Sequence, residues 1–594
     1  MGRFGQTHVQ WGDMARFNRF NAVLLCAASL VARTAEAQTV SPPSREEVTP
    51  VTAPLPPPPS EAHVDERSAF AAGPCPLDTS TVKVSIKQVK FSAPGGGDLA
   101  PEITGLLNGI TTTDSAQSIR VVCDLRDQAN ARLHQARYVA TVQVPAQRID
   151  DGVLRFEVIT GHITQIRLRG DAGPFEELVR KRTEKLILLD PLNAGDAEKQ
   201  LVTTNDTPGL SVKLGLSPNL SGKPGELVGE LTVSYRRATT IVSVQNYNSK
   251  LLGRETIYAR TEVYGLLTNN DVAFIAGAIT PDFKKQKILQ VGESFGLWSA
   301  GDRLSLSGTV AYSRPALDTI DLRTLSLIGN IEFEHPLART VRTRLAITGG
   351  FEYAMQRTRV YGGGGSTALN RDRIATFYTR LDGQARRFQL DGRLKWNLDG
   401  SLALRKGFNI LGATRVGQFV DGYGPSRFNG NADAFVVRGH LAGSYALGPV
   451  FELATTLQGQ YANKALLNYD QFAIGNLTIG RGYDPGANSG DRALAGAHEL
   501  RANFPVGRRS SGQLYGFYDW VHLWNLDQNS TERSRQLASV GGGFRFTYHD
   551  SIRADLTFAH PLDPPLLTGA NIRRSPNRVM FSLTAQLFPF GTNR

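Results

Sequence analysis

The residues whose types and spacing could do chemistry gather in one stretch, TIGRGYDPGANSGDRALAGAHELR, residues 478–501. Within it, Arg481, Gly482 and Tyr483 precede a turn-forming run of Asp, Pro, Gly and Asn, and charged residues stand towards both ends. An arginine carries a permanent charge and a planar fork of N–H donors, so its chemistry is carboxylate recognition rather than proton transfer. The role of this stretch therefore depends on the flanking segments, which alternate apolar and polar residues.

Signatures of catalysis and metal binding are missing from the sequence. It contains no H-E-x-x-H, C-x-x-C or G-x-x-x-x-G-K-[ST] motif, and its ten histidines are scattered without ligand spacing. We therefore expect no catalytic residue, no metal site and no cofactor. A carboxylate pair for hydrolysis is the one enzymatic alternative left open.

Length and charge argue against a single small domain and against a nucleic-acid-binding protein. With 594 residues and 41% hydrophobic residues, the chain is expected to form several domains with large buried surfaces. Its net charge is +12, but Lys and Arg are spread over the whole length without a basic run. We therefore expect no nucleic-acid partner, and solvated loops plus a positively lined cavity explain the charge better.

The pattern of residues at the N-terminus predicts an export signal. Residues 22–32, AVLLCAASLVA, are apolar, follow two arginines and precede an Ala-Glu-Ala cleavage signature, so residues 1–37 are predicted to be a signal peptide and Gln38 the first mature residue. Whether translation starts at Met1 or Met14 stays open.

Two cysteines, Cys75 and Cys123, remain after the predicted cleavage. An even pair in an oxidising compartment favours one disulfide bond, and two unpaired buried thiols are the alternative.

The mature chain divides into three regions. Residues 38–74 are rich in proline and predict an extended linker or mobile N-terminal arm. Residues 75–162 and 163–236 each predict the order β-α-α-β-β, which indicates two small tandem α/β domains. From residue 237 to 594 the apolar period is two almost throughout, as in RLSLSGTVAY, so each segment predicts a strand with one apolar and one polar face.

The third region predicts a closed transmembrane β-barrel. Sixteen such segments begin near residues 239, 254, 271, 285, 303, 323, 342, 373, 392, 435, 451, 498, 512, 536, 551 and 577. Short turns alternate with long connections, as in outer-membrane barrels, whereas a soluble β-sandwich would not explain sixteen half-polar strands in series. In this phase the tandem domains lie in the periplasm. Residues 464–497, between the eleventh and twelfth strands, lie at the outer face or fold back inside.

Three stretches in this order resemble one family: YVATVQVPAQRIDDGVLRFEVITGHI, PLNAGDAEKQLVTTNDTPGLSVKLGLSPN and FAIGNLTIGRGYDPGANSGDRALAGAHELR. They are similar, in turn, to the end of the first POTRA domain, to the second POTRA domain and to the inward loop of two-partner secretion transporters, the hemolysin secretion/activation proteins of the outer-membrane insertase superfamily. The likeness covers roughly residues 80–594. It implies a mainly β fold, with a 16-stranded antiparallel transmembrane barrel preceded by two periplasmic α/β POTRA domains.

The resemblance also implies a role for the opening stretch. The loop would fold into the barrel, where Arg481 would meet Asp519 in LYGFYDWVHLW, Gly482 would allow a tight turn and Tyr483 would wedge against the wall. An unpaired charge out of water is costly, which supports the pairing, and Arg481 on an ordinary exposed loop is the alternative. Gly480 departs from the usual Val or Ile of the family. The family's pore-plugging helix is doubtful here, because SREEV alone resembles a start for it.

The implied function is export of one large exoprotein with an N-terminal secretion domain across the outer membrane, by a monomer embedded in lipid and without nucleotide hydrolysis. A barrel-insertion factor of the same superfamily and a passive porin are the alternatives. The sequence does not distinguish an adhesin, a hemolysin or a contact-dependent toxin as cargo.

Overall fold

The computed structural model describes the chain from residue 42 onwards with gaps. The described residues are 42–49, 64–65, 75, 77, 80–149, 151–219, 223–297, 301–317, 320–389, 393–475, 479–486, 488–530, 532–549, 551–565 and 575–587. The predicted signal peptide, residues 1–37, lies outside these ranges.

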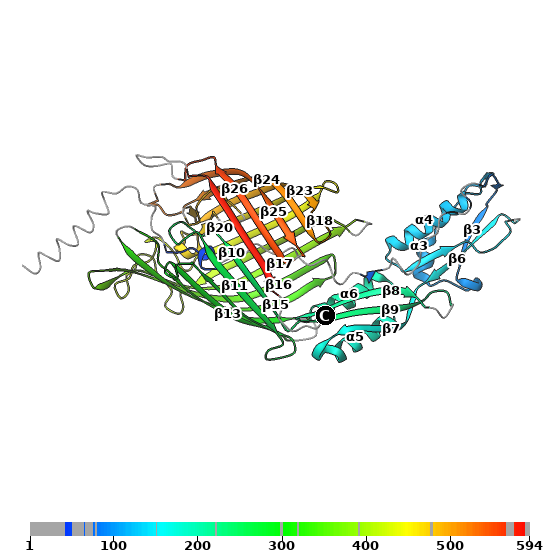
Figure 1. Cartoon of the computed structure of the whole chain (residues 1–594), viewed down its shortest axis with the longest axis horizontal. Coiled ribbons are helices and arrows are strands. Elements are labelled where there is room, and N and C mark those ends of the chain that lie inside the picture. The colour runs from blue at the N-terminus through cyan, green and yellow to red at the C-terminus, as the bar shows by residue number, and fades with distance from the viewer. Residues whose placement is uncertain are drawn as a thin grey trace, which may run out of the picture.

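A closed barrel of antiparallel strands forms the C-terminal part, as predicted (Figure 1). Its first strand, β10, pairs with its last, β27, and every other pair joins neighbours along the chain. The sixteen strands are β10 (Ala238–Gln245), β11 (Thr256–Tyr264), β12 (Asp271–Ile279), β13 (Gln286–Gly296), β14 (Arg303–Ser313), β15 (Asp321–Arg339), β16 (Thr343–Gly362), β17 (Gly365–Phe388), β18 (Leu394–Phe408), β19 (Phe435–Ala446), β20 (Phe451–Ala462), β23 (Arg492–Pro505), β24 (Ser510–Trp524), β25 (Ser534–Tyr548), β26 (Ile552–Pro561) and β27 (Arg578–Leu587).

The alternating pattern determines which side chains face outwards. In β14, Leu306 and Val310 are 41% and 47% exposed, whereas Ala311 and Ser313 are buried. Apolar side chains on the outer face and polar ones inside are what a barrel in lipid requires. No helix among the described residues has the length and apolar character needed to cross a membrane.

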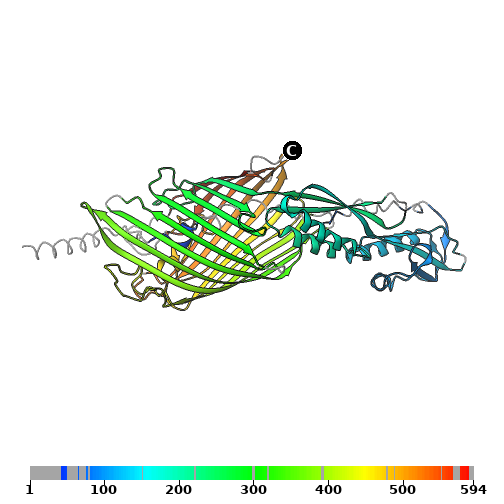
Figure 2. The same cartoon turned by 90° about the horizontal axis from the view of Figure 1, so that it is seen from below.

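Two small α/β domains lie in series beyond one end of the barrel (Figures 1 and 2). The sheet of the first has the order β3-β6-β5, from Gln88–Ser92, Val153–Thr160 and Ala140–Gln143, and packs on helices α3 (Pro101–Leu107) and α4 (Val121–Gln135). A short pair, β2 (Lys83–Val84) and β4 (Gln117–Ser118), completes it.

The second α/β domain is nearer the barrel (Figure 1). Its sheet has the order β1-β8-β9-β7, from Val64–Asp65, Leu210–Pro218, Glu226–Tyr235 and His162–Asp171, and packs on α5 (Glu176–Ile187) and α6 (Ala194–Asn205). Buried Val179, Leu201 and Leu231 belong to the core between helices and sheet. The predicted order of β-α-α-β-β thus describes the main elements of both domains, and the short strands β1 and β4 are additions to it.

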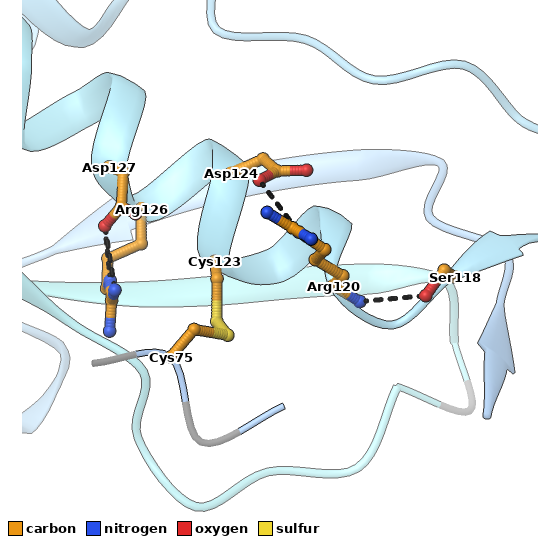
Figure 3. Close-up of a disulfide and its surroundings, with 7 residues drawn as sticks. All are labelled: Cys75, Ser118, Arg120, Cys123, Asp124, Arg126 and Asp127. Atoms are coloured by element: carbon orange, nitrogen blue, oxygen red, sulfur yellow. Dashed lines mark hydrogen bonds and ion pairs between the residues drawn. A yellow bond between two sulfur atoms is a disulfide. The ribbon is translucent and has the colours of Figure 1, made fainter. Parts of the chain in front are cut away.

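A disulfide bond joins Cys75 to Cys123 in the first α/β domain (Figure 3). Cys123 lies in α4, and the Cα atoms of the two cysteines are 6.0 Å apart. The bond therefore attaches the start of this domain to its longer helix.

Candidate functional site

The connection between β20 and β23, residues 463–491, folds back into the barrel. Arg481 is only 2% exposed, and Tyr483 and Asp491 are fully buried. Of the two positions predicted for this loop, the structure has the inward one, but the predicted range 464–497 is too long, because residues 492–497 belong to β23. Ile479 and Tyr483 pack with Val521 and Leu537 of the barrel wall, so the loop is part of the interior packing.

Arg481 and Asp519 form a buried ion pair. The Nη2 and Nε atoms of Arg481 donate to the two carboxylate oxygens of Asp519 at 2.6 and 3.0 Å. The backbone amide of Arg481 donates to Oδ2 of the same carboxylate at 3.0 Å. Asp519 lies in β24 with no exposed surface. This two-pronged geometry fixes the orientation of the guanidinium as well as its charge.

A second carboxylate, Glu499 of β23, completes the site and was missed from the sequence. The Nη1 atom of Arg481 donates to its Oε1 at 2.5 Å. Glu499 is opposite Phe517 in the ladder, next to the pair of Ala497 and Asp519, so it shares their inward face. The alternation in HELRANF indicates only which face of the strand Glu499 occupies, and the register with β24 brings it within reach of the same arginine.

Further arginines surround Glu499. Nη1 of Arg545 donates to its Oε2 at 2.9 Å, and Nε of Arg501 does so at 2.8 Å. Arg545 also pairs with Asp555 at 2.8 Å. The guanidinium carbon of Arg481 lies 3.6 Å from the centre of the Phe517 ring, which adds a cation–π contact. The loop arginine is therefore one member of an inner-wall charge network.

The roles predicted for the glycines need correction. Gly482 is not among the residues with positive φ; instead, a Cβ there would lie 2.6 Å from Cβ of Ser539 and 3.2 Å from Cα of Pro561. It allows the loop to touch β25 and β26, rather than to turn. The left-handed position is Gly480, with φ of 68°. A Val or Ile would be strained there, so the departure at Gly480 serves the backbone.

Tyr483 occupies the wedge position that was predicted for it. Its hydroxyl oxygen lies 2.8 Å from the carbonyl oxygen of Ala538 and 3.1 Å from that of Asp563, so its hydrogen is donated to one of them. The backbone amide of Gly482 donates to Oγ of Ser539 at 3.3 Å. Together these contacts attach the loop to β25 and to the connection after β26.

A short helix, α2 (Arg45–Val48), also lies inside the barrel (Figure 1, blue segment). Arg45 donates through two nitrogens to both carboxylate oxygens of Glu352, each at 2.7 Å, and through Nη2 to Asp470 of the inward loop at 2.8 Å. The linker or mobile arm predicted for residues 38–74 is therefore wrong for residues 42–49. Four residues carry almost no helical signal, and this helix is stabilised by partners more than 300 positions away.

A local capping box and hydrogen bonds from the barrel wall define the ends of α2. Ser44 and Glu47 form a capping box, and the amide side chains of Gln286 and Gln356 donate to the carbonyls of Glu47 and Pro43, both at 2.9 Å. Burial raises the pKa of the Glu46 and Glu47 carboxyls above their ordinary value.

Among the described residues, no group of three or more His, Cys, Asp or Glu side chains is arranged to hold a metal ion. The site is thus an assembly of ion pairs and packed loops inside a barrel.

Comparisons with known proteins point to one family. The family model described as haemolysin secretion/activation protein ShlB/FhaC/HecB matches residues 232–546. A heme/hemopexin transporter protein, HuxB of Haemophilus influenzae strain 86-028NP, is 24% identical over 453 residues, covering 72% of this chain and 74% of the relative.

Solved structures share the fold. CdiB from Escherichia coli superposes with a TM-score of 0.57 at 16% identity, over 98% of this chain and all of that chain. CdiB from Acinetobacter baumannii gives a TM-score of 0.50 at 15% identity, with the same coverage of both chains.

Proposed function

Because this chain belongs to the haemolysin secretion/activation protein family of two-partner secretion transporters in the bacterial outer membrane, we propose that it exports one large partner exoprotein from the periplasm to the cell surface. We assign residues 75–162 and 163–236 to two POTRA domains and residues 237–594 to the barrel, with a single chain forming the working unit. The observation that supports export most directly is the barrel lumen, which holds an inward loop and a short helix fastened by ion pairs.

Capture of the exoprotein takes place on the POTRA domains. The edge of the second POTRA sheet already pairs with an extended segment, since Val64 and Asp65 lie parallel to β8 opposite Leu214 and Gly215. Val64 is fully buried and belongs to the hydrophobic core of this domain. An unfolded secretion domain would add a strand in the same way and displace β1, with backbone hydrogen bonds providing affinity for varied sequences.

The helix α2 and the inward loop, which both lie in the lumen, gate the barrel. The exoprotein passes as an extended chain when α2 leaves and the inward loop shifts. Arg481 with Asp519 and Glu499, and Arg45 with Glu352, hold the closed state. Such buried pairs can stabilise one of two discrete arrangements.

No nucleotide is needed for the movement. Folding of the exoprotein outside the cell removes the form that could slide back, so mass action gives direction. An adhesin, a hemolysin or a contact-dependent toxin would all be compatible with this mechanism. The gene next to this one is expected to encode a very large exported protein with a β-helical N-terminal domain.

Deletion of the gene distinguishes export from the runner-up function, insertion of other barrels. We expect the exoprotein to disappear from the surface while the amounts of other outer-membrane barrels stay unchanged, by surface immunoblotting and membrane proteomics. Loss of many unrelated barrels with normal exoprotein export would favour the insertion factor. Complementation with the intact gene is the control.

A further inference from the structure

Two neighbouring strands, β16 and β17, carry arginines on the outward face of the barrel. On β16, Gln356 is buried in the lumen against the segment before α2, so the next residue, Arg357, faces outwards. On β17, Asp372 is 1% exposed and faces inwards, so Arg371 and Arg373 face outwards. Arg357 lies directly opposite Arg371 in the ladder, and Arg373 is the next outward residue of β17. We call these three residues the outer arginine cluster.

The outer arginine cluster lies just beyond the apolar band of the barrel, at the end away from the α/β domains. Arg339, the last residue of β15, pairs with Asp206 of the second α/β domain, so β16 runs away from that domain. The outward residues of β16 from Leu345 to Met355 are apolar, aromatic or glycine. A strand segment of that length, tilted by about 40°, rises ~25 Å, which is the height of the apolar band in outer-membrane barrels. The next outward residue is Arg357, so the cluster lies at the level of the outer-leaflet headgroups.

The charge of the cluster is only partly balanced within the part of the chain that the structure describes. Arg371 pairs with Asp421 at 3.0 Å. Neither Arg357 nor Arg373 forms an ion pair with a described carboxylate, and the Nε atom of Arg373 is buried without a hydrogen-bond partner. Like charges directly opposite each other in a ladder destabilise it. An anion bound between these side chains would remove the repulsion and supply the missing acceptors.

Apolar side chains border the cluster. Phe377 faces outwards from β17, is 49% exposed, and its ring centre lies 4.7 Å from that of Phe351 in β16. The connection between β18 and β19 passes beside Arg373, because a Cβ on Gly412 would lie 2.8 Å from Nη1 of this arginine. The neighbouring Leu411 is 61% exposed. Cationic groups next to exposed apolar ones match a ligand that has an anionic head and acyl chains.

We propose that the outer arginine cluster binds the phosphate group of an anionic lipid in the outer leaflet. Arg357 and Arg373 donate to the phosphate oxygens, for which the planar fork of guanidinium donors is suited. Phe377 and Leu411 contact the acyl chains below the headgroup. This lipid site belongs to the outer surface of the barrel and stands independently of the export function.

Native mass spectrometry of the full chain in detergent tests this site. The probe is diphosphorylated lipid A, and its dephosphorylated form presents the same acyl chains without the anion. We expect the native protein to bind the phosphorylated form more tightly, a comparison that needs no variant. Arg357→Gln with Arg373→Gln should weaken this binding by about 10- to 100-fold, the factor for losing charge-assisted hydrogen bonds. Arg357→Lys with Arg373→Lys keeps both charges and should weaken it less.

A matched pair of lysines separates a specific site from a general attraction to the outer rim. Lys284 and Lys287 lie at the same end of the barrel, at the turn between β12 and β13, and both are exposed. Lys284→Gln with Lys287→Gln removes the same charge and should leave the affinity unchanged. Equal affinity for the two lipids, unchanged affinity in the arginine variant, equal weakening by the lysine variant, or displacement of the lipid by an equal concentration of inorganic phosphate would overturn the proposal.

Discussion

Arg481 of the inward loop donates three hydrogen bonds to the carboxylate of Asp519 in β24, two from side-chain nitrogens and one from its backbone amide, at 2.6 to 3.0 Å. The carboxylate is fully buried and the arginine nearly so. Removing one member of such a pair leaves the other charge buried without its partner, which costs roughly 3–5 kcal/mol. The closed loop therefore depends strongly on this contact.

Reversal of the loop charge should stop export without removing the barrel. In Arg481→Glu the new carboxylate faces both Asp519 and Glu499, so the loop cannot settle in its site. We expect the exoprotein to be lost from the cell surface at normal barrel levels in the outer membrane. Adding Asp519→Arg should restore export only in part, because Glu499 still repels the loop. Normal export by the single variant would remove the gating role.

The two carboxylates should contribute unequally to loop closure. Asp519 accepts three hydrogen bonds from Arg481 and Glu499 accepts one. Tryptic cleavage after Arg481 in intact membranes reports on loop opening. It should be slow in the native protein, rise roughly 100-fold or more in Asp519→Asn, and rise less in Glu499→Gln. The opposite order would contradict this assignment of roles.

A methyl group at Gly482 should displace the loop from the wall. Its Cβ would lie 2.6 Å from Cβ of Ser539, too close for any real contact, so Gly482→Ala should speed cleavage after Arg481 and reduce export. Gly349→Ala, on the wall of β16 with open space around its Cβ, is the matched control and should behave as the native protein. Equal behaviour of both variants would show that the close approach has no consequence.

Loss of the Arg45 contacts should free the lumen helix. Arg45→Ala leaves Glu352 and Asp470 without their shared cation, and we expect α2 to leave the lumen more often. Conductance across planar bilayers should then show a larger time-averaged current than the native channel. Arg371→Ala, which removes the ion pair between Arg371 of β17 and Asp421 of the connection between β18 and β19, should leave the current unchanged. An unchanged current in Arg45→Ala would mean that α2 does not limit the pore.

The disulfide should stabilise the first POTRA domain. A bond that closes a loop of 48 residues stabilises by about 4 kcal/mol through restriction of the unfolded chain. Cys75→Ser with Cys123→Ser in the full chain should make this domain susceptible to proteolysis at lower temperature, with the barrel fragment unaffected. Resistance equal to that of the native protein would show that the bond contributes little.

The large features were predictable because their signals are periodic. Alternation over ten residues at a time located all sixteen barrel strands, and repeated helix and strand order located the two α/β domains. Asp519 could be named because the family resemblance implied an acidic partner for Arg481 on that wall segment. Glu499 could not be named, because its role depends on the register between β23 and β24. Alternation within one strand does not specify that register.

Contacts between distant segments explain the remaining misses. The helix Arg45–Val48 is too short to nucleate alone and exists because Glu352 and Asp470 bind its arginine. Likewise, Gly482 resembles a turn residue in sequence, and only the approach of Ser539 shows that space determines its identity. Arg578 of β27 has no local signal, since it donates to the carbonyl oxygens of Gly475 and Arg481 in the inward loop, 103 and 97 positions earlier.

Site-specific crosslinking tests the central claim, that the exoprotein passes through this barrel. Ser401 lines a cavity in the barrel lumen together with Arg45 and Glu352, whereas its neighbour Leu402 is 49% exposed on the outer face. With a photoreactive amino acid at position 401 and the exoprotein stalled during secretion, irradiation should give a barrel–exoprotein adduct. The same amino acid at position 402 should give none. Absence of the adduct from position 401 while export proceeds would contradict the account.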